Sequence, residues 1–207
     1  QLTLRTKADV KNFDGKPIEP EKPQTGSFFK ETFGTGTYPS GNRPKINEFK
    51  DFDMKAPVVY TDDSGVADIR SVSGDNGAHI WLPATKDVII KVTGINTQNK
   101  GDVSLSFQLA ANLFDAGSAA NINNIQLKVN GVVVALPNQP LTNAGGDNSK
   151  FYTVTIPGIA QAANLTLEFI SAADSNKVGF RLDNIELTGG SSNGGNPGGP
   201  IIVTPTK

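Results

Sequence analysis

The sequence predicts an all-β fold, a two-sheet jelly-roll β-sandwich with flanking linker segments. About ten short apolar runs are separated by turn residues, and no run has the length and period of an extended helix. The 22 glycines and 13 prolines, with many Asn, Ser and Thr residues, supply the turns that such a fold needs. Cysteine is absent, which excludes disulfides, thiol catalysis and zinc–thiolate sites.

The main domain is expected to span residues 26–189 and to begin with a strand in residues 27–33. Residues 34–55 show little periodicity and are expected to form a long structured loop, which in compact domains is usually a binding loop. Further strands are expected at residues 57–61, 66–72, 78–82, 88–93, 103–109, 124–129, 132–136, 151–156, 165–170 and 178–187. A single helical turn is expected within residues 116–121.

Two of these segments carry specific signals. Residues 103–109 alternate apolar and polar side chains, which predicts one core face and one polar face. Asn130-Gly131 lies between two apolar runs. This pair is typical of a two-residue type I′ hairpin, in which both central residues need a positive φ.

The last strand changes its pattern halfway. Phe180 and Leu182 share one face, whereas the next apolar residues, Ile185 and Leu187, have the opposite parity. An inserted residue at Asp183-Asn184 would restore all of them to one face, so a β-bulge is predicted there.

The two ends are expected to lie outside the sandwich. Residues 1–25 combine one short strand, 1–6, with a proline-rich linker, 16–23, and are interpreted as the tail of an upstream domain. Residues 190–207 are interpreted as a Gly/Ser/Asn/Pro-rich linker and the start of a following segment. The sequence leaves open whether 1–6 and 201–204 pair with the sandwich. The chain is thus expected to be one module, with neighbouring domains of the same polypeptide as its partners.

The charge balance argues against two classes of partner. Lys and Arg total 19 and Asp and Glu total 20, so nothing indicates nucleic acid or an anionic membrane as a partner. The apolar runs are too short for a spanning helix, and direct membrane insertion is not expected.

Several motifs occur in an order that resembles a known group of modules. They are Phe29-Lys-Glu-Thr-Phe-Gly-Thr-Gly36, Ala67-Asp-Ile-Arg-Ser71, His79-Ile-Trp-Leu-Pro83, Val92-Thr-Gly-Ile-Asn96 and Phe180-Arg-Leu-Asp-Asn-Ile-Glu-Leu187. Together they resemble the jelly-roll, carbohydrate-binding-module-like domains of Bacteroidetes surface lipoproteins and adhesins. The resemblance covers roughly residues 27–189. It implies a secreted or cell-surface, extracytoplasmic location in a Gram-negative bacterium and a glycan or surface polysaccharide as partner.

The resemblance also implies a structural calcium between an acid of the first strand and one of the last, here Glu31 and Asp183. Because calcium takes six to eight oxygen ligands, Asp53, Asp51 and loop carbonyls are candidates to complete the shell. In the alternative interpretation, Asp183 only caps the bulge and Glu31 is a solvated surface acid.

Trp81, the single tryptophan, is the first candidate for stacking on a sugar ring. If Ile80 and Leu82 face the core, Trp81 is exposed together with His79; the reverse orientation buries Trp81 as a core residue. Tyr38 and Tyr60 are further aromatic candidates. Arg70 and Asn112 are candidate partners for sugar hydroxyls.

Catalysis has little support, and the domain is not expected to be an enzyme. His79 is the only histidine, so a Ser-His-Asp triad would depend on it alone, and no Gly-x-Ser-x-Gly motif accompanies it. Three functions are weighed: a glycan-binding or adhesion module, a structural spacer, and, remotely, a glycoside hydrolase or lyase. An exposed Trp81 favours the first, an aromatic-free surface the second and a deep acidic cleft the third.

Overall fold

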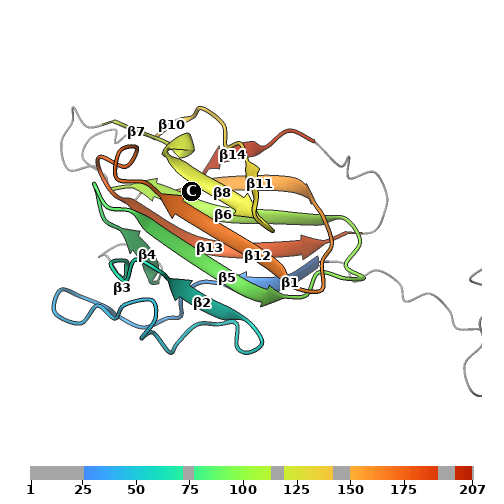
Figure 1. Cartoon of the computed structure of the whole chain (residues 1–207), viewed down its shortest axis with the longest axis horizontal. Helices are drawn as coiled ribbons and strands as arrows, with labels where there is room; N and C mark the ends of the chain where they lie inside the picture. Colours follow the sequence, from blue (N-terminus) through green and yellow to red (C-terminus); the bar gives the residue numbers. More distant parts are fainter. Residues whose placement is uncertain (1–25, 72–76, 113–118, 142–149, 191–198, 207) are drawn as a thin grey trace, which may run out of the picture.

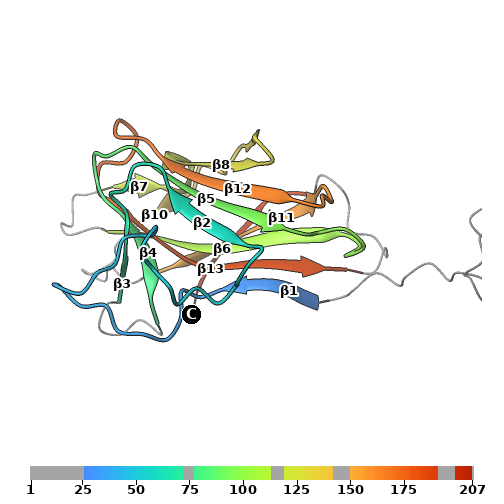
Figure 2. The same cartoon turned by 60° about the horizontal axis from the view of Figure 1, so that its bottom comes forward.

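The computed structural model describes residues 26–71, 77–112, 119–141, 150–190 and 199–206. The strand and the proline-rich linker predicted within residues 1–25 lie outside this part. The described chain forms a two-sheet jelly-roll β-sandwich, as predicted (Figures 1 and 2). Within the described residues, no helix has the length and apolar character needed to cross a membrane.

One layer is a seven-stranded sheet. Six strands run in the order β14-β11-β6-β13-β4-β3, and β1 also pairs with β13. Strands β1 and β4 pair with different halves of β13, which is the longest of these strands. The bounds are β1 Gly26–Glu31, β3 Asp68–Arg70, β4 His79–Leu82, β6 Val103–Ala111, β11 Tyr152–Ile159, β13 Phe180–Gly189 and β14 Ile202–Pro205.

The other layer is a five-stranded sheet in the order β2-β5-β12-β8-β9. Figure 2 shows β2, β5 and β12 lying over β6 and β13 of the first sheet. The bounds are β2 Val59–Asp62, β5 Val88–Ile95, β8 Ile125–Val129, β9 Val132–Val134 and β12 Leu165–Ser171. A separate two-stranded ribbon pairs β7, Ala120–Asn121, with β10, Pro140–Leu141.

Each of the eleven strand segments predicted from the sequence is found as a strand, with ends that shift by a few residues. The short strands β7 and β10 were not predicted. The question left open for residues 201–204 is answered, because β14 pairs with β11 at the edge of the larger sheet. The helical turn expected within 116–121 falls partly outside the described residues; the structure has a 3₁₀ turn immediately afterwards, at Ile122–Asn124.

The core lies between the two sheets and follows the predicted alternation. In β6 the apolar residues at 103, 105, 107 and 109 are fully buried, whereas the polar residues between them are half-exposed. Phe107 of β6 meets Phe169 of β12 edge to face, with ring centroids 5.1 Å apart, so the two sheets interlock at this pair.

Both special backbone positions predicted from the sequence are confirmed. Asn130 and Gly131 have φ values of 50° and 78° and join β8 to β9 in a tight hairpin. In β13 three residue steps from Asp183 to Glu186 face only two steps of β6, so one residue is inserted. Asn184 lies in this bulge with φ 48°, and its side-chain amide Nδ2 donates to Gln108 Oε1 at 2.7 Å.

The long loop between β1 and β2 closes one side of the sandwich. Lys45 bridges to Asp68 of the β3 edge, and the Ile69 amide donates to the Pro44 carbonyl at 3.0 Å. Two residues later, Asn47 exchanges two hydrogen bonds with the backbone of Asp62 in β2, at 2.9 and 3.0 Å. The loop therefore covers an edge strand of each sheet.

Candidate functional site

The outer face of the seven-stranded sheet gathers polar side chains from four adjacent strands. Strand alternation turns Ile69, Ile80 and Leu182 into the core, and their neighbours therefore face outward. Arg181 pairs with Trp81, and Trp81 pairs with Asp68, so these three residues form one row across β13, β4 and β3. Sheet pairing thus brings together residues that are more than 100 positions apart in the sequence.

Trp81 faces outward, as it must when Ile80 and Leu82 are both fully buried. Its ring is half-buried, because the Arg70 guanidinium carbon lies 3.3 Å from the ring centroid. This stacked arrangement is a cation–π contact. The indole N–H is buried and finds no hydrogen-bond acceptor among the described residues. Trp81 is therefore neither a core residue nor an open platform, because an arginine covers part of its ring.

Arg70 is held in place by Asp68, two residues earlier on the same face of β3. Its Nε donates to Asp68 Oδ1 at 2.6 Å and its Nη2 donates to Asp68 Oδ2 at 3.2 Å. Lys45 Nζ lies 3.7 Å from the same Oδ2 and donates to the Val66 carbonyl at 2.9 Å. The bidentate pair fixes the guanidinium over the indole.

Asn112 lies at the opposite end of the row, just after β6. Its Oδ1 is 3.5 Å from Arg181 Nη2, and its backbone amide donates to the Gly179 carbonyl at 2.9 Å. Arg181 is 1% exposed, and His79, also on this outer face, is 1% exposed with its ring 6.3 Å from the ring of Phe151. Of the predicted ligand-binding residues, Trp81, Arg70 and Asn112 are thus brought to one face of the sheet.

Tyr38 and Tyr60 are not on this face, and their expected role as exposed stacking residues does not fit the structure. Both are less than a tenth exposed. The Tyr60 ring stacks on Phe52 at 3.9 Å and 6°, and the Tyr38 ring packs edge-on against Phe49 at 5.4 Å. They belong to an aromatic cluster that anchors the long loop to the core, and no ring face is left for a sugar.

Beside this cluster lies a buried carboxylate, Glu31, at the inner edge of β1. Its Oε1 accepts from the amides of Phe33 and Asp53, at 2.7 and 3.1 Å. Its Oε2 accepts from the Met54 amide at 3.2 Å and from the Tyr60 hydroxyl at 2.6 Å. One side chain thus joins the first strand, the loop and β2 of the opposite sheet.

Burial affects the ionisation of this group. Because water is excluded, the pKa of Glu31 is raised above its usual range, although the four donors oppose the shift by stabilising the anion. Burial and the neighbouring carboxylate both raise the pKa of Tyr60, which therefore remains a hydrogen-bond donor. The pKa of Tyr38 is raised by burial and by its hydrogen bond to Asp51.

The three residues predicted to hold calcium do not form a calcium site in this arrangement. The lone pairs of Glu31 are already occupied by four donors, and Asp53 Oδ2 accepts from both the amide and the hydroxyl of Thr32. Glu31 is opposite Ile185 in the β1–β13 pairing, close to Asp183 along the chain. However, Glu31 faces inward, whereas Asp183 lies on the outer face. Within the described residues no group of three or more His, Asp or Glu side chains is placed to hold a metal ion.

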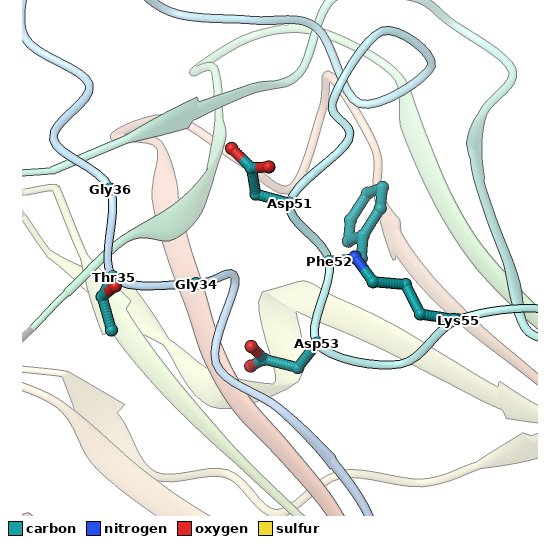
Figure 3. Close-up of a pocket in the computed structure, with 7 residues that line it drawn as sticks. All are labelled: Gly34, Thr35, Gly36, Asp51, Phe52, Asp53 and Lys55. Carbon is teal, nitrogen blue, oxygen red and sulfur yellow. The ribbon is translucent and has the colours of Figure 1, made fainter.

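A groove of about 520 Å³ opens on the loop side of the sandwich. Figure 3 shows its two walls, with the side chains of Asp51 and Asp53 pointing across the gap towards the Gly34–Gly36 segment. Both carboxylates already accept hydrogen bonds, from the Tyr38 hydroxyl and from Thr32 respectively. The groove is a polar surface depression rather than the deep acidic cleft that a glycosidase would need.

The outer-face residues that the sequence did not single out are Lys45, Asp68 and Arg181. A signal for two of them was present, because Asp68 and Arg181 alternate with apolar residues in predicted strands, and such charges must face outward. Lys45 carried no signal, since it lies in an irregular loop whose path depends on both sheets.

Sequence comparisons find no protein-family model and no curated protein that matches this chain. Solved structures with a partly similar arrangement include the CBM22-1 xylan-binding domain of Paenibacillus barcinonensis Xyn10C, with 13% identity, 80% of this chain and 96% of that chain covered, and a TM-score of 0.44. A CBM35 of the same species has 19% identity, coverage of 72% and 100%, and a TM-score of 0.42. A family 35 carbohydrate-binding module of Clostridium thermocellum has 12% identity, coverage of 63% and 92%, and a TM-score of 0.42. These likenesses are too distant to assign a function to this chain.

Proposed function

We propose that this domain is a non-catalytic module that binds carbohydrate on the outer face of its seven-stranded sheet, around Trp81. The observation that carries the proposal is the row Arg181–Trp81–Asp68, in which sheet pairing sets one aromatic ring among charged side chains. Arg70 lies over the Trp81 ring, and Asn112 extends the row beyond Arg181.

This composition suits a sugar better than an apolar ligand. Sugars present apolar C–H faces rimmed by hydroxyl groups, so their sites combine an aromatic surface with hydrogen-bonding side chains. The half-exposed part of Trp81 supplies the aromatic surface, while the side chains of Arg70, Asn112 and Gln108 lie partly exposed and can bond hydroxyls. All of them lie on or next to paired strands, so they are held before the ligand arrives.

A binding role fits the buried position of the only histidine. His79 lies on the same outer face, yet only 1% of it is exposed and its ring packs against Phe151. A general base must reach the proton that it abstracts, and a side chain enclosed in this way does not reach a bound glycan.

The test compares Trp81→Ala with Val133→Ala, a control on the outer face of the other sheet, where Val133 is 53% exposed. A glycan array identifies a ligand for the unchanged domain, and titration calorimetry then measures both variants. We expect Trp81→Ala to weaken binding at least about tenfold, with a stability loss of only about 1–2 kcal/mol from the lost cation–π contact. Val133→Ala should bind normally. If the unchanged domain retains no glycan, it is a spacer; if both variants bind equally well, the site lies elsewhere.

A further inference from the structure

Resting on the proposed carbohydrate site, we propose that its ligand is an acidic glycan and that Arg43, Lys45 and Arg70 hold the carboxylate or sulfate group. These three cations lie together where the long loop meets the edge of β3. The inference concerns the ligand class of the Trp81 site and adds two loop residues, Arg43 and Lys45, to it.

The register of the loop against β3 places Arg43. Lys45 is paired antiparallel with Asp68, and the Ile69 amide donates to the Pro44 carbonyl at 3.0 Å. One step further along the same register, Arg43 comes opposite Arg70. This extension of the register puts the backbone of Arg43 opposite that of Arg70, with Lys45 two residues further along the loop.

Charge is in excess at this edge. Among the described residues, Asp68 pairs with two of the three cations, with Arg70 at 2.6 Å and with Lys45 at 3.7 Å. Asp68 is 6% exposed and therefore takes up little of the surface at this edge. Asp183, a further carboxylate on this outer face, belongs to β13, on the far side of β4. Within the part of the chain that the structure describes, the ion pairs of these three cations thus involve a single carboxylate.

The Arg43 side chain carries a buried hydrogen-bond donor, its Nε atom. Its Nε is buried and finds no hydrogen-bond acceptor in the part of the chain that the structure describes. A buried donor without an acceptor costs free energy, which an anionic ligand would recover. Arg70 engages Nε and Nη2 with Asp68, and Nη1 makes neither of these bonds, so the two guanidinium groups can both donate to one anion.

Arg70 also disfavours a purely neutral ligand. With its guanidinium carbon 3.3 Å from the Trp81 ring centroid, it occupies the ring face on which a neutral sugar would stack. A neutral sugar would have to displace a bidentate ion pair. An acidic sugar can instead bond to the guanidinium and pack its ring beside the exposed part of the indole.

The test uses ligand pairs that differ in charge. Polygalacturonate is compared with its methyl-esterified form, and chondroitin sulfate with unsulfated chondroitin, by titration of the whole domain. We expect binding to polygalacturonate or chondroitin sulfate to be at least about tenfold stronger than to the less charged partner, and to weaken near 1 M salt, where the Debye length is about 3 Å. The ligand pair with the larger difference in affinity shows whether the recognised group is a carboxylate or a sulfate.

Arg43→Gln is the decisive variant, because it removes a charge without breaking any hydrogen bond that the structure shows for Arg43. It should weaken binding of the acidic ligand roughly tenfold and leave the melting temperature unchanged. Lys128→Gln, on the outer face of the other sheet, is the matched control and should bind normally. Equal binding of both members of each pair, or an unaffected Arg43→Gln, overturns the inference while the carbohydrate module stands. Absence of binding to every glycan, acidic or neutral, overturns the proposed function itself.

Discussion

Two tyrosines provide a direct test of how much the buried Glu31 carboxylate contributes to stability. Tyr60 donates its hydroxyl to Glu31 Oε2 at 2.6 Å, and Tyr38 donates its hydroxyl to Asp51 Oδ2 at 3.1 Å. Both rings are buried, so Tyr→Phe deletes one oxygen atom at each site and leaves the ring packing in place. The two acceptors differ, because Glu31 is fully buried whereas Asp51 is exposed.

The different exposure of the two acceptors predicts unequal losses of stability for the two Tyr→Phe changes. A hydrogen bond to a charged group contributes about 1.5–3 kcal/mol, and water cannot replace the lost donor at Glu31. Tyr60→Phe should therefore lower the free energy of unfolding by about 2 kcal/mol, equivalent to a fall of about 4–8 °C in the melting temperature for a domain of this size. At Asp51 water can replace the hydroxyl, so Tyr38→Phe should cost less than about 1 kcal/mol.

The cost of Tyr60→Phe should also depend on pH. The folded-state pKa of Glu31 is raised by burial, so the part of the stability that depends on its proton is fully present below the ordinary pKa of a glutamate. It is lost as the pH rises through the folded-state value. The Tyr60 hydroxyl stabilises the anion, so its deletion costs most at neutral pH and progressively less as Glu31 becomes protonated.

Urea unfolding of the unchanged domain and of both variants, at neutral pH and near pH 4, measures these differences at constant m-value. Equal losses for Tyr38→Phe and Tyr60→Phe would refute the argument, because then burial of the acceptor would not matter. A loss at Tyr60 that grows on acidification would refute the argument that the Tyr60 hydroxyl stabilises the Glu31 anion.

Two further predictions concern the effect of calcium on stability and the replacement of two glycines. Because four donors fill the Glu31 carboxylate, calcium and a chelator should give the same melting temperature; a calcium-dependent rise would restore the calcium site expected from the resemblance. Gly94 (φ 80°) leaves no room for a Cβ, which would overlap the Pro57 carbonyl, whereas Gly131 (φ 78°) has open space. Gly94→Ala should cost about 2–4 kcal/mol in urea unfolding and Gly131→Ala only about 1–2 kcal/mol, and equal losses would show that backbone strain alone decides.

Much of the sandwich follows from local pattern. The alternation in β6, the Asn130-Gly131 hairpin and the parity change at Asp183-Asn184 each specify a geometry within a few residues, and the structure has all three. These features were predictable because the information is short-range. The orientation of Trp81 was left open by the sequence, and the structure decides it, because its two fully buried aliphatic neighbours leave it only the outer face.

Strand β2 shows where such reasoning fails. Val59 is 52% exposed, while Tyr60 and Asp62 face inward and are buried, the reverse of the usual apolar-in pattern. The inversion is tolerated because the inward-facing polar groups form hydrogen bonds with a distant residue or with residues of the turn that follows β2. Tyr60 meets Glu31, and the Asp62 carboxylate accepts from the amide and hydroxyl of Ser64 and from the Ala67 amide. No pattern within β2 reveals these partners.

The long loop has the length of a binding loop, yet the proposed site lies on the sheet. Irregular segments of this length suggest ligand contacts, yet most polar groups in this loop are used internally. Asn47 satisfies the edge of β2, Lys45 reaches Asp68 at the edge of β3, and the amides of Asp53 and Met54 satisfy Glu31. A loop committed in this way has few groups left for a ligand. The loop residues that belong to the proposed site are Arg43 and Lys45, because they lie where the loop meets β3, beside the Trp81 row of the sheet.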